Sequence, residues 1–146
     1  MITRSFATGT RKVAYTVFAS AAFLLVAAPY MLRGDVPSGH EKLLLSKSLA
    51  DMPDKKLTAV VVRYAPGGKS PKHHHGGDVF AFVISGAVRS QNSATGPARI
   101  YHAGESFFEP ATSVHLLSEN ASSQEPAQLL AVFVADSGAQ LTTMDP

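Results

Sequence analysis

Short β-forming segments separated by turn residues constrain this chain most. Between Leu57 and Asp136, runs of β-branched and aromatic residues alternate with clusters of Gly, Pro, Asn and Ser, and the turn signals recur roughly every eight to twelve residues. The expected strands lie at 43–45, 57–64, 79–84, 87–91, 98–102, 106–109, 113–117 and 128–135. No helix longer than a turn is indicated in this region. The pattern predicts an all-β sandwich or barrel.

An uncharged run near the N-terminus predicts a different element. Residues Val13–Leu32 contain no charge, and as a helix they would extend about 30 Å, roughly the thickness of a bilayer's hydrocarbon core. Basic residues precede the run and the chain after it is acidic overall, which favours an N-terminus inside and a domain outside. We expect residues 1–32 to be a signal anchor or signal peptide, and the protein to be exported. A buried core helix is the alternative.

The fate of this segment depends on one small-residue site. Val26-Ala27-Ala28 is followed by Pro29, which is disfavoured just after a cleavage site, so an uncleaved anchor is slightly favoured. The protein is therefore expected in the periplasm, or anchored to the membrane and facing the periplasm or exterior. Residues 33–41 are rich in turn formers and predict a tether, and residues 42–146 are assigned to the barrel domain.

Charge and composition exclude several kinds of site. Four of the 13 basic residues precede Gly34, which leaves nine basic against 11 acidic residues in the rest of the chain. The domain is therefore mildly acidic without a basic stripe, and no nucleic-acid partner is expected. The chain has no cysteine, which excludes disulfides, thiolate metal sites and cysteine nucleophiles.

Three consecutive histidines, His73-His74-His75, open a strand-like segment. Alternate side chains of a strand share a face, so His73 and His75 point together, about 6.6 Å apart, while His74 points the other way. Two such imidazoles can bind one metal ion if a neighbouring strand supplies a third ligand. The triplet by itself suits a solvated turn equally well.

Two segments resemble the paired motifs of the cupin superfamily. GGKSPKHHHGGDVFAFVISGAVRSQ is similar to the first motif and AGESFFEPATSVHLLSENAS to the second, and together they extend the resemblance over Leu57–Asp136. The resemblance implies a double-stranded β-helix, or jelly roll, inside which His73, His75 and His115 converge. It also implies a divalent transition metal as cofactor, with iron, manganese, nickel, copper and zinc all left open.

The chain departs from the family pattern at one position in each motif. The first motif carries a glutamate whose position, counted back from Gly86, is occupied here by Val79. Asp78 is adjacent, but strand alternation places it on the opposite face unless Gly76-Gly77 forms a bulge. Thr112 stands where the second motif has a glycine, which affects the geometry of the turn.

Glu109 is the candidate replacement for the absent carboxylate. It stands where family members usually place an inward apolar residue, so it would act as a fourth ligand or as a general acid/base, with burial raising its pKa towards neutrality. The alternative is a glutamate at the barrel mouth, paired with Arg89 or Arg99. Gln91, on the adjacent strand, is a second candidate as a neutral ligand or a hydrogen-bonding partner of the substrate.

The other conspicuous side chains have structural interpretations. His40 in the tether and His102 on a strand are expected to be exposed. Five phenylalanines are assigned to the core or to a subunit contact, namely Phe80, Phe82, Phe107, Phe108 and Phe133. The face that carries Phe80, Phe82 and Ile84 would permit a homodimer.

Three functions follow from these features. The first is a small-molecule metalloenzyme of the cell envelope, dioxygenase- or isomerase-like, whose apolar lining of Val79, Ala81 and Val83 favours a modest, partly apolar substrate. The second is a non-catalytic cupin module that binds or senses a ligand or metal. The third is a structural domain whose histidines bind nothing.

Overall fold

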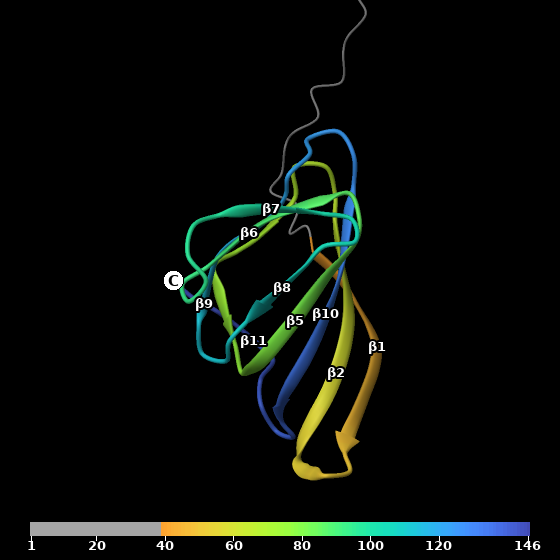
Figure 1. Cartoon of the computed structure of the whole chain (residues 1–146), viewed down its shortest axis with the longest axis vertical. Coiled ribbons are helices and arrows are strands. Elements are labelled where there is room, and N and C mark those ends of the chain that lie inside the picture. The colour runs from red at the N-terminus through yellow and green to blue at the C-terminus, as the bar shows by residue number, and fades with distance from the viewer. Residues whose placement is uncertain (1–38) are drawn as a thin grey trace, which may run out of the picture. The chain divides into compact units, whose positions relative to one another are not determined.

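The computed structural model describes residues 39–146, which form strands and contain no helix within these bounds (Figure 1). The strands are β1 (Gly39–Leu49), β2 (Met52–Tyr64), β3 (Lys69–Ser70), β4 (His73–His75), β5 (Gly77–Ser85), β6 (Ala87–Asn92), β7 (Arg99–His102), β8 (Ser106–Glu109), β9 (Val114–Asn120), β10 (Ala127–Asp136) and β11 (Thr142–Met144). The prediction of an all-β fold is confirmed. The hydrophobic helix expected within residues 1–32 lies outside the described residues.

The strands form two antiparallel sheets. One has the order β1-β2-β10-β5-β8, and the other has the order β11-β4-β9-β6-β7, with β3 pairing to β9. From β4 onward the chain passes repeatedly from one sheet to the other, which is the winding of a jelly roll. In Figure 1, β10 lies between β2 and β5, which are distant from it in sequence.

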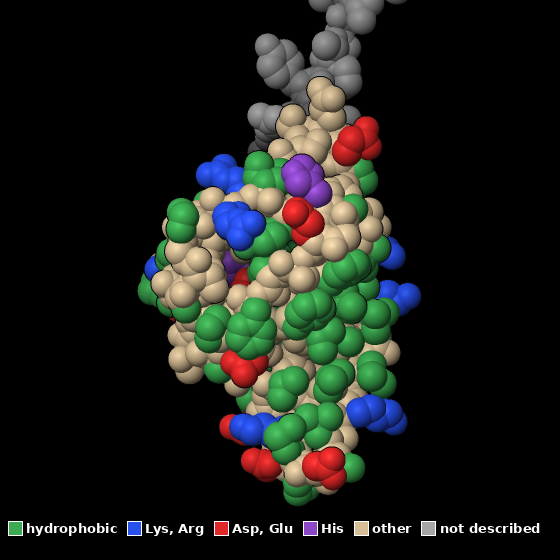
Figure 2. All heavy atoms as spheres, in the orientation of Figure 1, with side chains coloured by type: hydrophobic (Ala, Val, Ile, Leu, Met, Phe, Trp, Pro, Cys, Tyr) green, Lys and Arg blue, Asp and Glu red, His purple; other side chains and the backbone are tan. Residues whose placement is uncertain are grey.

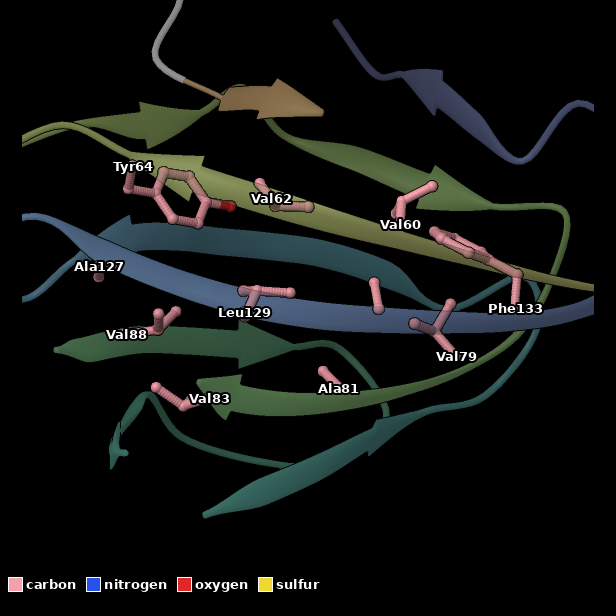
Figure 3. Close-up of a cluster of buried hydrophobic side chains, with 11 residues drawn as sticks. Val60, Val62, Tyr64, Val79, Ala81, Val83, Val88, Ala127, Leu129 and Phe133 are labelled. Atoms are coloured by element: carbon pink, nitrogen blue, oxygen red, sulfur yellow. The ribbon is translucent and has the colours of Figure 1, made fainter. Parts of the chain in front are cut away.

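The core lies between the facing surfaces of the sheets. Burial alternates along β5 and β10, as expected for strands with one face on the core. Figure 3 shows side chains of β2, β5, β6 and β10 pointing into the same space. Each fully buried Val, Leu or Phe stabilises such a core by roughly 1.5–3 kcal/mol. The core residues are Val60, Val62, Tyr64, Val79, Ala81, Val83, Val88, Ala127, Leu129, Ala131 and Phe133.

The first hairpin is longer than the sequence indicates. Strand β1 begins at Gly39, so His40 and Glu41, which we had assigned to the tether, belong to a strand paired with β2. Both side chains are exposed. Polar residues have weak strand propensity, and pairing with β2 overrides it. Among residues 39–146 no helix is long and apolar enough to cross a membrane.

The alternation of buried and exposed side chains continues without interruption from β4 to β5, through the sheet crossing at Gly76-Gly77. Residues 73, 75, 77, 79, 81 and 83 are all buried, so no bulge shifts the register. A Cβ on Gly77 would lie 2.4 Å from the carbonyl oxygen of Val134, which explains why the crossing requires a glycine. Asp78 is exposed and accepts a hydrogen bond from the Ala111 amide at 2.8 Å. Its predicted outward orientation is confirmed.

Candidate metal site

Three histidines from two strands meet inside the sandwich. His73 and His75 lie on β4, and His115 on β9 is the direct cross-strand partner of His73. Their exposed fractions are 6%, 8% and 5%, and one ring nitrogen from each lies within 4.8 Å of the others. The predicted convergence is confirmed. His74 points away, and its Nδ1 lies 2.8 Å from Asp145.

Backbone carbonyls fix the orientation of two of these rings. His73 Nδ1 lies 2.6 Å from the carbonyl oxygen of Pro71, and His75 Nδ1 lies 3.0 Å from that of Leu141. A carbonyl only accepts, so each Nδ1 carries the hydrogen and Nε2 is left with a lone pair when the ring is neutral. Burial lowers the pKa of His73, although its bond to Pro71 opposes this. The rings are thus held in the form that binds metal.

The third ring is held by side chains. His115 Nε2 lies 3.0 Å from Ser90 Oγ, on the inner face of β6. Ser90 was missed by the sequence analysis, although its alternation with the apolar Val88 points it inward. The choice of Gln91 is wrong for the same reason. Gln91 pairs with Leu117, faces away from Ser90 and does not line the cavity.

Glu109 lies beside two of the three histidines. Only 2% of it is exposed, and its carboxylate oxygens lie 3.0 Å from His115 Nδ1 and 3.3 Å from His75 Nε2. Its predicted inward orientation is confirmed, and an ion pair at the barrel mouth is excluded. Arg89 pairs with Glu119 instead, and Arg99 lies over the ring of Tyr101.

The charge state of Glu109 differs from the expected one. Burial does raise the pKa of Glu109, but the closeness of the His115 and His75 imidazoles outweighs burial and brings the pKa to about 2. Glu109 is therefore an anion at neutral pH. The expectation that its pKa approaches neutrality is wrong, because the adjacent imidazoles were not included in that argument.

A small cavity adjoins the cluster. It holds about 520 Å³ of space, part of it open to solvent. Val79 and Ala81 line it as predicted, with Phe107 and Phe133, whereas Val83 lies in the core outside it. Tyr64 contributes a hydroxyl that hydrogen-bonds to Ser70 at 3.0 Å and Ser118 at 2.7 Å. No lysine or arginine is among the lining residues.

The second motif's two remaining features are structural. Thr112 has φ +65°, a left-handed conformation that a glycine would adopt without strain, and its amide donates to the carbonyl of His75 at 3.3 Å. Asn120 is buried, and its amide donates to the carbonyls of Ala65 and Glu125. It ties the end of β9 to two loops.

Comparison with known proteins agrees with this geometry. A family model described as a cupin domain matches residues 60–133. A search of curated proteins finds no match. Among solved structures, an uncharacterised Klebsiella pneumoniae protein with a double-stranded β-helix domain is 23% identical, with 78% of this chain and 90% of that chain covered and a TM-score of 0.59.

Two enzymes share the fold. DMSP lyase DddQ from Ruegeria pomeroyi is 20% identical, with 73% of this chain and 51% of that chain covered and a TM-score of 0.58. Oxalate decarboxylase from Bacillus subtilis is 22% identical, with 73% of this chain and 28% of that chain covered and a TM-score of 0.56. The chain spans about half the length of the lyase and less than a third of the decarboxylase.

Proposed function

Because the chain belongs to the cupin family, we propose that its three-histidine cluster holds a divalent transition metal and acts on a small molecule. The proposed chemistry is dioxygenase- or isomerase-like. The observation that carries the proposal is the convergence of three buried imidazoles, two of which have Nδ1 committed to a carbonyl and Nε2 free to bind an ion. Iron, manganese, nickel, copper and zinc all suit such ligands.

The residues present fit a metal ion. Buried neutral imidazoles whose Nε2 carries no hydrogen cannot hydrogen-bond to one another through that nitrogen, because lone pairs then face lone pairs. A bound divalent ion would polarise a substrate oxygen or lower the pKa of a bound water. Mn(II) centres are named in work on the similar oxalate decarboxylase, which supports the same class of ion here.

The cavity restricts the substrate. Its volume of about 520 Å³, part of it open to solvent, suits a small molecule. Its walls are mainly apolar and include no lysine or arginine, so a negative charge on the substrate would have to be balanced by the metal. The Tyr64 hydroxyl and its serine partners are positioned to orient one oxygen of the substrate.

The proposal is tested on the full-length chain. Stoichiometric metal after purification, and a rise in melting temperature on adding divalent ions, are expected. Absence of both would refute a metal site. Dioxygen uptake or product formation with phenolics and keto acids is then expected of the loaded protein.

A non-catalytic binding or sensing module is the second candidate. The observation that favours it is Val79, which occupies the position of the usual carboxylate in the first motif. If the protein binds metal but turns over nothing across a broad panel, this module becomes the better assignment.

We also propose that the protein functions in the cell envelope. The uncharged run Val13–Leu32 and the basic residues before it support export, with membrane contact if the segment is retained. Cell fractionation of the full-length chain tests this. A protein found entirely with cytosolic markers would contradict it.

A homodimer is proposed through the outer face of the five-stranded sheet. Phe80, Ile84 and Phe108 are 45%, 45% and 51% exposed on this face, and Figure 2 shows hydrophobic side chains gathered over β5, β10 and β2. Contiguous apolar surface of this kind is typical of an interface. A second copy is the occupant that the symmetry of most oligomers favours.

A further inference from the structure

We propose that Glu109 is the anionic ligand of the metal and that it is supplied by β8 in place of the β5 position at which the family motif carries its carboxylate. The inference rests on the proposed metal site and adds a ligand to the three histidines. It concerns binding, so it can be tested without knowing the reaction.

The register of the two strands makes this substitution geometrically possible. Val79 on β5 pairs directly with Glu109 on β8. Residues opposite each other on antiparallel strands share a face, with Cβ atoms about 4.5–5.5 Å apart. Both side chains line the cavity. A carboxylate at 109 therefore reaches the same space as one at 79 would, from the neighbouring strand.

The surroundings of Glu109 favour a cation. Neither of its buried oxygens makes a well-aligned hydrogen bond, and its two near neighbours are ring nitrogens of His75 and His115. With its Nδ1 hydrogen directed to Leu141, a neutral His75 turns an unprotonated Nε2 towards the carboxylate at 3.3 Å. Two lone pairs then face each other, which is favourable only with a positive charge between or beside them.

The cavity offers no other source of that charge. Its lining contains no lysine or arginine, and buried carboxylates without a partner are strongly disfavoured. A protonated imidazole would satisfy the contact only by placing a hydrogen on Nε2, and that nitrogen could then not bind an ion. A metal ion held by the histidines would place a positive charge beside the carboxylate, which lies 3.0 Å from His115 and 3.3 Å from His75.

The test uses Co²⁺ as the probe at pH 8, where the imidazoles are neutral, with the full-length chain. Four proteins are compared, namely the unchanged chain, Glu109→Gln, the relocation variant Val79→Glu with Glu109→Val, and the control Asp78→Asn. Calorimetric titration gives the affinity, and visible absorption reports the ligands. The control removes an equal charge from Asp78, which precedes Val79 on β5 and lies on the outer face of the sheet.

Glu109→Gln is expected to weaken Co²⁺ binding by more than the roughly 10–100-fold cost of losing an outer partner, and to change the absorption spectrum. The relocation variant is expected to recover most of that loss, and Asp78→Asn to behave like the unchanged chain.

The possible failures are distinct. If the unchanged chain binds Co²⁺ and Glu109→Gln binds it within twofold with the same spectrum, Glu109 is not a ligand, although the histidine site stands. If the unchanged chain binds no Co²⁺, the proposed metal site and this inference both fall. Glutamine has nearly the shape of glutamate, so Glu109→Gln alone decides whether Glu109 is a ligand, even if the relocation variant does not fold.

Discussion

Val79 and Glu109 lie directly opposite each other on β5 and β8, with both side chains facing the cavity. The first motif lacks its carboxylate, but the cavity does not, because Glu109 stands thirty positions later in the chain on the neighbouring strand. The two positions are separated by one strand spacing of about 4.8 Å. A search for the motif along one strand would score this site as incomplete. The carboxylate of Glu109 is recognised as a neighbour of this site only once the strands are paired.

The histidines provide the first prediction. His75→Ala and His115→Ala should each weaken metal binding by more than the roughly 10–100-fold cost of losing an outer partner, whereas His74→Ala should leave it unchanged because that ring faces Asp145. Metal content and the metal-induced rise in melting temperature measure this. If His74→Ala weakened metal binding as much as His75→Ala, the assignment of these two side chains to opposite faces of β4 would be wrong.

Acid should weaken metal binding, because protons compete for the imidazole nitrogens. Burial lowers the pKa of His73 from its usual 6.5, so this ligand stays neutral at pH 6.5 and affinity should fall below about pH 6. The unfolded chain binds that proton more readily, so the metal-free protein should also lose stability as the pH falls below 6.5. Titrations and melting curves between pH 5 and 8 test both, and tighter binding in acid would refute the assignment.

Thr112 should be improved by glycine. The left-handed backbone at φ +65° strains a β-branched residue, and its relief should exceed the entropic cost of glycine, giving a gain of about 1 kcal/mol. Ala111→Gly is the matched control, and it should lose roughly 0.5–1 kcal/mol. Denaturant unfolding measures both, and a loss of stability in Thr112→Gly would show that the turn is not strained.

Gly77→Ala should destabilise the fold by about 3 kcal/mol, since the added methyl overlaps the backbone of β10. Gly138 has open space where a Cβ would be placed, so Gly138→Ala should be nearly neutral. Thermal melting of the two variants provides the comparison. Equal melting temperatures would mean that the crossing has more room than the structure shows.

The dimer prediction can be checked by solution size. Phe80→Asp should convert a dimer into a monomer, whereas Leu116→Asp, an exposed residue on β9 of the other sheet, should not. Light scattering at several concentrations measures this. A monomeric parent protein, or a dimer unaffected by Phe80→Asp, would rule out this face.

Much of the site follows from strand alternation. His73 and His75 share a face because their positions differ by two, and Glu109 could be placed inward from its context in the second motif. Gln91 was chosen without this rule, which selects Ser90 instead because Ser90 shares the buried face of β6 with Val88. An error of one residue in the register of a strand moves every side chain to the opposite face of the sheet.

Other features could not be obtained from local patterns. The carbonyl that orients His75 belongs to Leu141, and β11 pairs with β4, yet both lie outside the segment that resembles the family. The polar half of β1 has little strand propensity and is extended by its partner β2. Each of these depends on which strands become neighbours.

The carbonyl of Leu141 has a consequence for the order of assembly. His75 receives its orienting bond from a residue 66 positions further along the chain, so the three adjacent imidazoles of a newly made or unfolded chain are not yet a site. Ion capture should therefore follow closure of both sheets, and refolding with metal present should begin at the same rate as refolding without it.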